Sequence, residues 1–175
     1  HDKILRLART IADLDACEEF TVNELAPHIK AYDSYPGIAL TEGKYALSHA
    51  WNGDARQGLL STDEPDRYVW GLGAPVTELW MDNWAIPVGA PNPEAAHAFI
   101  DYVLAPENSL AELDYIGYHT GATGIEQAAN DAQLEMLDLV FFTPEQLATM
   151  HEGAVTEAQG RIVEIWNAMK AAAGA

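Results

Sequence analysis

Apolar residues recur at spacings of three and four in several stretches of the chain, the period of an amphipathic α-helix. At the N-terminal end this pattern predicts a helix over residues 1–16. Further helices are expected over 92–104, 106–116 and 155–173. The residues expected to face inward from the 92–104 and 155–173 helices are Ala96, Phe99, Ile100, Val103, Ile162, Ile165, Trp166 and Met169.

Capping residues mark where several helices begin. Asn92 followed by Pro93 and Glu94 is a favourable start, and Thr143-Pro144-Glu145-Gln146 repeats the combination of cap and proline. Thr21-Val22-Asn23-Glu24 has the form of a capping box, but Pro27 limits the helix that it opens to a short one. Asn52 is expected to cap a helix that runs through Leu60.

Short runs of β-branched and aromatic residues alternate with these helices and predict strands. Turn-rich and polar segments, 33–43 and 61–66, separate them. The expected strands are 29–32, 45–51, 68–72 and 80–87. Helices that alternate with short strands indicate an α/β fold.

One of these expected strands also carries candidate chemistry. Side chains two residues apart on a strand share a face, so Trp80, Asp82 and Trp84 would point the same way. Aromatic faces attract an ammonium group, and a carboxylate supplies the counter-charge. The pattern therefore suits half of a cation site. The alternative is that both tryptophans fill a core and Asp82 caps a turn.

The charge of the chain narrows the class of partner. There are 27 acidic and 9 basic residues among 175, a formal net charge of −18. A charge of this sign favours encounter with cationic solutes and argues against a nucleic-acid partner, although simple solubility would explain it too. The length allows one or two domains.

The sequence offers little support for catalysis, a metal or a cofactor. Cys17 is the one cysteine, which leaves no disulfide or thiolate cluster. The histidines form no His-Glu-x-x-His motif, and there is no nucleophile elbow, phosphate loop or dinucleotide fingerprint. We therefore expect no catalytic residues, metal or cofactor. The alternative from the enzyme class is a hydrolase with a pair of cleft carboxylates.

Four sequence blocks occur in an order and at separations that resemble the second half of a known family. They are Tyr45–Ala55, Leu79–Pro87, Asn92–Leu104 and Ile116–Thr120. Together they are similar to the spermidine/putrescine-type periplasmic binding proteins, the solute receptors of polyamine ABC importers. The resemblance implies a two-lobe periplasmic-binding-protein fold of type II, here only its C-terminal half. It assigns 1–79 and 127–175 to the second lobe and 80–126 to a crossover segment of the first.

The resemblance also assigns ligand residues. Trp51 and Trp80 match aromatic walls for a methylene chain, and Asp82 matches a carboxylate for an ammonium group. Tyr118 matches a third wall, and Ser34 a polar position of the cleft. Trp84 is expected in the core, and His119 is a further candidate for the cleft because it adjoins Tyr118.

The implied function is capture of putrescine or spermidine and delivery to a membrane ABC permease. The implied location is extracytoplasmic, either periplasmic or lipid-anchored at the cell surface. Related receptors take opines, amino-acid derivatives or sugars, and a ferric receptor would need tyrosines and a histidine at the cleft. Because the remaining ligand residues and lobe belong to the N-terminal half, we expect that half, or self-association, to complete the structure.

Overall fold

The computed structural model describes residues 20–73, 77–153 and 159–174, which form two compact units. The described residues of the first unit are 20–34, 71–73, 77–80, 143–153 and 159–174. The second contains 35–70 and 81–142. The predicted helix over 1–16 and Cys17 lie outside the described residues. The division into receptor lobes, 1–79 and 127–175 against 80–126, stays a prediction.

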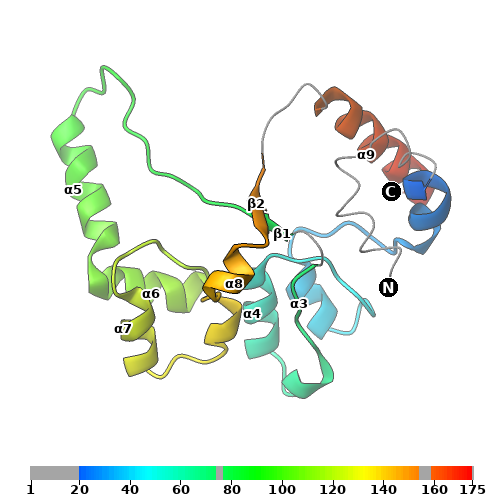
Figure 1. Cartoon of the computed structure of the whole chain (residues 1–175), viewed down its shortest axis with the longest axis horizontal. Helices are drawn as coiled ribbons and strands as arrows, with labels where there is room; N and C mark the ends of the chain where they lie inside the picture. Colours follow the sequence, from blue (N-terminus) through cyan, green and yellow to red (C-terminus); the bar gives the residue numbers. More distant parts are fainter. Residues whose placement is uncertain (1–19, 74–76, 154–158, 175) are drawn as a thin grey trace. The chain divides into compact units, whose positions relative to one another are not determined.

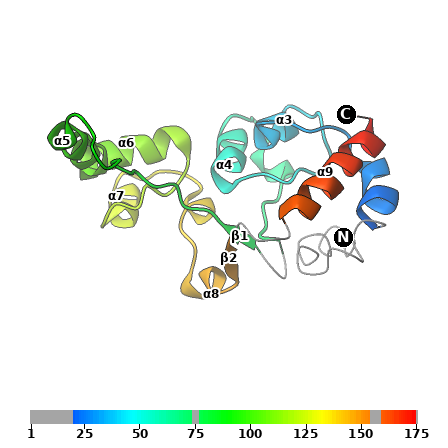
Figure 2. The same cartoon turned by 90° about the horizontal axis from the view of Figure 1, so that it is seen from above.

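The first unit joins short helical turns, a long helix and a pair of strands. A π-helical turn, η2 (Phe20–Leu25), continues into η3 (Ala26–His28), and α9 (Gln159–Ala173) packs against both, as Figures 1 and 2 show. Strand β1 (Thr77–Leu79) pairs in parallel with β2 (Met150–Glu152), which follows the short helix α8 (Pro144–Leu147).

The second unit is mainly helical. Helix α3 (Pro36–Thr41) packs on α4 (Asn52–Leu60), and the turn η4 (Pro65–Arg67) follows. After an extended segment come α5 (Pro93–Leu104) and α6 (Pro106–Ile116). Helix α7 (Ile125–Asp131) and the turn η5 (Leu137–Leu139) complete the unit.

The capping predictions of the second half are confirmed. The Asn92 side chain accepts a hydrogen bond of 3.0 Å from the Ala95 N–H at the start of α5. Thr143 and Gln146 form a reciprocal capping box at α8. Helix α6 ends at Gly117, whose φ of +83° is the left-handed conformation that glycine adopts at little cost. Local side-chain chemistry therefore located these ends correctly.

The strand predictions are wrong. Segments 29–32, 45–51, 68–72 and 80–87 contain no strand, and the strand near them is Thr77–Leu79. The turn-rich segment 33–43 contains helix α3 instead. A strand forms only where a neighbour satisfies its backbone groups, and among the described residues β1 and β2 supply the one pairing. Trp80, Asp82 and Trp84 therefore do not share a strand face.

The predicted inward face of α5 is only partly correct. Ala96, Ile100 and Val103 are the least exposed residues of the helix, as predicted, but none is fully buried and Phe99 is 52% exposed. Trp84, expected in the core, is 58% exposed, with its ring edge-to-face with Phe99 at 5.4 Å. Periodicity identified an apolar face, but the described residues do not cover it.

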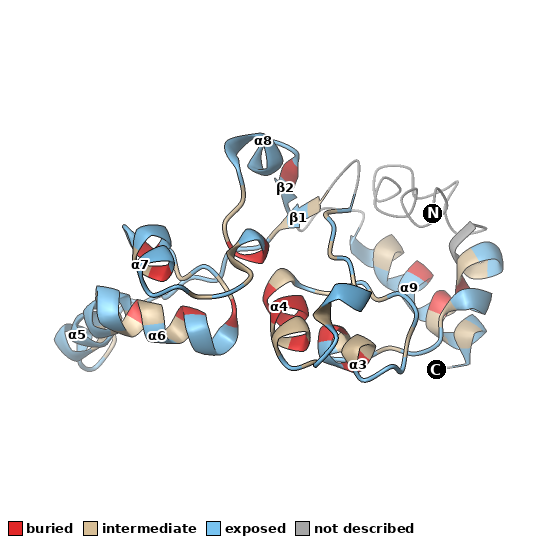
Figure 3. Ribbon diagram, turned by 90° about the horizontal axis from the view of Figure 1, so that it is seen from below, coloured by how far each residue is buried: buried red, intermediate tan, exposed pale blue. Residues whose placement is uncertain are grey.

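The hydrophobic cluster of the second unit lies around α6 and α7 instead, and Figure 3 shows buried residues in red on these helices and on α4. The buried residues of the cluster are Leu113, Ile125, Ala129 and Val140. In the first unit, Ile165 and Met169 of α9 are buried, as predicted, whereas Trp166 is 46% exposed. No helix among the described residues has the length and apolar character needed to cross a bilayer.

Candidate ligand site at the start of helix α4

Helix α4 is tied to several other segments of its unit by side-chain hydrogen bonds. Asn52 Nδ2 donates to the Leu139 carbonyl at 2.8 Å, and Arg56 Nε donates to the Glu135 carbonyl at 2.9 Å. Gln57 Nε2 donates to the Tyr115 carbonyl, at the end of α6, at 2.8 Å. These bonds join segments far apart in sequence and hold the N-terminal end of α4 in place.

Two of the predicted ligand residues lie at this end of α4, Trp51 as its N-cap residue and Tyr118 against Gly53. Trp51 has an extended backbone and a side chain 64% exposed. The Tyr118 ring covers Gly53, and a Cβ atom on Gly53 would lie 2.4 Å from that ring. The backbone of Gly117 also packs closely on Gly53, because a Cβ atom on Gly117 would lie 2.9 Å from the Gly53 carbonyl oxygen. The half-buried Tyr118 ring therefore packs against the backbone of α4 two residues after the exposed Trp51.

The surroundings of Tyr118 favour its neutral form. Burial is the largest cause acting on the pKa of its hydroxyl and raises it. A hydrogen bond with the Asp54 backbone lowers the pKa, and the charge of the Asp54 carboxylate raises it, so that the net shift is upward. At neutral pH Tyr118 thus presents an uncharged ring and a hydroxyl.

Asp54 is the buried charge nearest to this pair of aromatic residues. Its side chain is 6% exposed, and its Oδ2 accepts a hydrogen bond of 2.6 Å from the Gly37 N–H. Its position in the first turn of α4 places a negative charge at the positive end of the helix dipole. The hydrogen bond fixes the start of α4 against α3.

The other predicted ligand residues lie in other segments of the two units. Asp82 belongs to the same unit as Trp51, in an extended segment, and is exposed. Trp80, 68% exposed, and Ser34, also exposed, belong to the other unit. The structure therefore brings Tyr118 to the start of α4, where Trp51 is the N-cap residue. The ligand role of all five residues stays a prediction.

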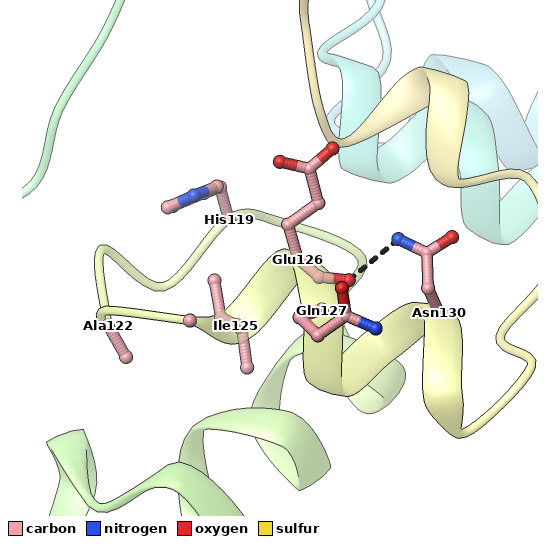
Figure 4. Close-up of a pocket in the computed structure, with 7 residues that line it drawn as sticks. His119, Ala122, Ile125, Glu126, Gln127 and Asn130 are labelled. Carbon is pink, nitrogen blue, oxygen red and sulfur yellow. Dashed lines mark hydrogen bonds between the residues drawn. The ribbon is translucent and has the colours of Figure 1, made fainter.

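His119 lines a shallow hollow of about 410 Å³ beside α7, shown in Figure 4. Its Nδ1 accepts a hydrogen bond of 2.8 Å from the Gly121 N–H, and its ring packs edge-to-face on Phe141 at 5.3 Å. Glu126 and Asn130 of α7 add polar groups to the hollow, and Asn130 Nδ2 donates to the Glu126 carbonyl at 2.7 Å. The hydrogen bond to Gly121 and the ring contact with Phe141 give His119 a structural role at the turn after α6.

Three residues of the site were not predicted from the sequence: Gly53, Gly117 and Asp54. Asn52-Gly53-Asp54 follows Trp51 directly, so a glycine and an acid in the first helical turn were the available signal. Their importance depends on contacts with α3 and with the turn at Gly117, which are distant in sequence. Among residues 20–73, 77–153 and 159–174, no three His, Cys, Asp or Glu side chains are grouped for a metal ion.

Comparison with known proteins identifies the family. The family model described as bacterial extracellular solute-binding protein matches residues 12–157. The chain belongs to this family. The predicted α/β solute-binding fold is thereby confirmed, and the described residues combine helices with a parallel strand pair. No solved structure is a match for the chain.

Curated relatives carry more specific names. The chain is similar to the spermidine/putrescine-binding periplasmic proteins of Salmonella typhimurium and Escherichia coli (strain K12), each 33% identical over 103 residues. That match covers 57% of this chain and 28% of the relative. The putrescine/agmatine-binding protein of Pseudomonas aeruginosa is 25% identical over 134 residues, 73% of this chain and 35% of the relative. The solute-binding chain thus matches about a third or less of these relatives' length.

Proposed function

We propose that this solute-binding chain is part of an extracytoplasmic receptor for a polyamine such as putrescine or spermidine. The observation that carries the proposal is the aromatic pair at the start of α4, because Trp51 and Tyr118 come from two separate sequence blocks and both lie at the first turn of this helix. The names of the relatives support the choice of solute.

The chemistry of a diamine suits the predicted residues. Its methylene chain needs apolar walls without charge, which an exposed indole and a neutral phenol supply. Its ammonium groups need acceptors with full negative charge, and Asp82 is the candidate. A net charge of −18 draws a dication toward the receptor from a distance.

Other solutes fit this arrangement less well. A ferric ion needs several oxygen or nitrogen ligands around one point, and no three His, Cys, Asp or Glu side chains of the described residues are grouped in that way. A sugar would stack on the aromatic walls, but as a neutral molecule it would gain nothing from the net negative charge of the chain. An opine or amino-acid derivative would bring a carboxylate, which Asp54 and Asp82 would repel.

The wider role follows from the family. We place the receptor outside the cytoplasm, in the periplasm or held by a lipid anchor, where it passes its solute to a membrane ABC permease. Transport receptors of this kind release the solute unchanged, so we assign no catalytic residue.

Truncation of the aromatic walls tests the proposal. Trp51→Ala and Trp80→Ala should each weaken spermidine binding to the complete gene product by about 1–3 kcal/mol, through lost contact area and cation–π attraction. Isothermal titration calorimetry measures the loss, and cooperative thermal unfolding should persist. Trp84→Ala is the matched control, since it removes an indole that contacts Phe99 and should leave affinity unchanged. Equal affinities for all three variants would refute the assignment of the walls.

The apolar face around α5 suggests how the receptor is completed. Trp84, Phe99 and Tyr102 are each more than half exposed, a larger aromatic surface than single scattered residues provide. We propose that the N-terminal half of the receptor covers this face, which is consistent with the small share of the relatives' length that the chain matches.

The isolated 175-residue chain should consequently self-associate through this face. Light scattering should show dimers or larger species whose population falls in Phe99→Ser, because the substitution replaces an exposed aromatic ring by a small polar side chain. Val69→Ser, also at an exposed apolar residue but apart from α5, is the control. A parent chain that stays monomeric at all concentrations would contradict the proposed covering of α5.

A further inference from the structure

Asp54 makes a contact that its place beside the aromatic pair does not explain. A buried carboxylate joins the first turn of α4 to the start of α3, through Oδ2 and the Gly37 N–H at 2.6 Å. The two helices touch backbone to backbone at this point, because a Cβ atom on Gly37 would lie 2.5 Å from the Asp54 carbonyl oxygen. The hydrogen bond therefore stabilises a close backbone contact between α3 and α4, in which a side chain at Gly37 would not fit.

The other carboxylate oxygen is buried as well. Asp54 Oδ1 has no hydrogen-bond partner among the described residues, although a desolvated acceptor of this kind is costly to bury. The neighbours of Asp54 in the chain are the parts of the candidate site. The Tyr118 ring packs against Gly53, and Trp51 is the N-cap residue of the same helical turn.

We infer that Asp54 is a positioning residue for the solute site: its hydrogen bond to Gly37 fixes the first turn of α4 and thereby sets the spacing between Trp51 and Tyr118. The inference rests on the proposed function for the identity of the solute. The placement of Tyr118 by Asp54 is a property of the solute-free protein. It can therefore be tested without any solute.

Two variants separate positioning from a direct role of the charge. Asp54→Asn keeps an acceptor of the same length for the Gly37 N–H, whereas Asp54→Ala removes it. In the complete gene product, titrated with putrescine, we expect Asp54→Ala to lose about ten-fold in affinity and Asp54→Asn to stay within about three-fold of the parent. Asp63→Asn, an exposed acid of the same unit, is the control for net charge and should bind like the parent.

A second measurement needs no solute. The pKa of the Tyr118 hydroxyl is read from the NMR shifts of its ring carbons as pH rises, with Tyr118→Phe used for assignment. If Asp54 positions the ring, Asp54→Ala admits water and the raised pKa falls toward the ordinary tyrosine value. In Asp54→Asn the burial remains, so the pKa stays raised, lowered only by loss of the neighbouring charge. If Asp54→Ala does not fold, Asp54→Ser takes its place with the same expectations.

The outcomes are distinct. Positioning is overturned if Asp54→Ala, or Asp54→Ser in its place, keeps both the parent affinity and the parent Tyr118 pKa. It is equally overturned if Asp54→Asn loses as much affinity as Asp54→Ala, since the charge would then act on the solute directly. If the parent protein does not bind putrescine, the proposed function fails, and the Tyr118 titration still decides whether Asp54 positions the ring.

Discussion

Replacing Asp82 by asparagine is expected to weaken putrescine binding by about 2–5 kcal/mol, the cost of leaving an ammonium group without its buried counter-charge. Asparagine keeps the size of the side chain and can still accept a hydrogen bond, so the loss reports the charge. Asp82 is exposed in the chain as described, and an effect of this size requires that the bound solute and the rest of the receptor exclude water from it.

Calorimetry on the complete gene product measures this loss. Asp101→Asn is the matched control, because it removes the same charge from an exposed position on α5 and should change the affinity little. If Asp82→Asn and Asp101→Asn bind putrescine alike, Asp82 does not contact an ammonium group and the negative charge of the chain acts only at long range.

Gly53→Ala should damage both the fold and the site. The added methyl group would lie 2.4 Å from the Tyr118 ring, so the ring, or the backbone of Gly117 beside it, has to move. Overpacking of this kind costs about 1–3 kcal/mol of stability. Because Tyr118 is displaced from its place beside Trp51, amine affinity should fall as well.

Gly160→Ala is the control for this substitution. Gly160 lies in helix α9 with open space around its Cα atom, and alanine is the better helix former. Thermal unfolding should show a lower midpoint for Gly53→Ala and an equal or higher one for Gly160→Ala. Equal stability and affinity of Gly53→Ala and the parent would contradict the close packing of Tyr118 on α4.

Local signals in the sequence predicted the starts of α5 and α8 well, but not the start of α4, where Trp51 and not Asn52 is the N-cap residue. Asn92 and Thr143 act as caps because their side chains reach backbone N–H groups within a few residues, an interaction that needs no distant partner. Gly117 ends α6 for an equally local reason. Helices 92–104 and 106–116 were therefore predictable to within a residue.

Strands and burial depend on partners that a local pattern does not name. The aromatic run through Trp80 and Trp84 has the composition of a strand, but it forms none without a neighbour, and Phe99 is exposed because the described residues do not cover α5. In the candidate site too, some residues could be predicted from local sequence and others depend on distant partners. Trp51 and Tyr118 could be recognised from their sequence blocks, whereas the roles of Gly53 and Asp54 depend on Tyr118 and Gly37 in the folded chain.

The central claim is that the receptor recognises a cationic diamine by its charges and its methylene chain together. Its most direct test is titration of the complete gene product with putrescine and, separately, with 1,4-butanediol, which has the same carbon chain without charge. The account predicts saturable binding of putrescine that weakens as ionic strength rises, and no detectable binding of the diol. Equal binding of the two compounds, or binding of neither, would contradict it.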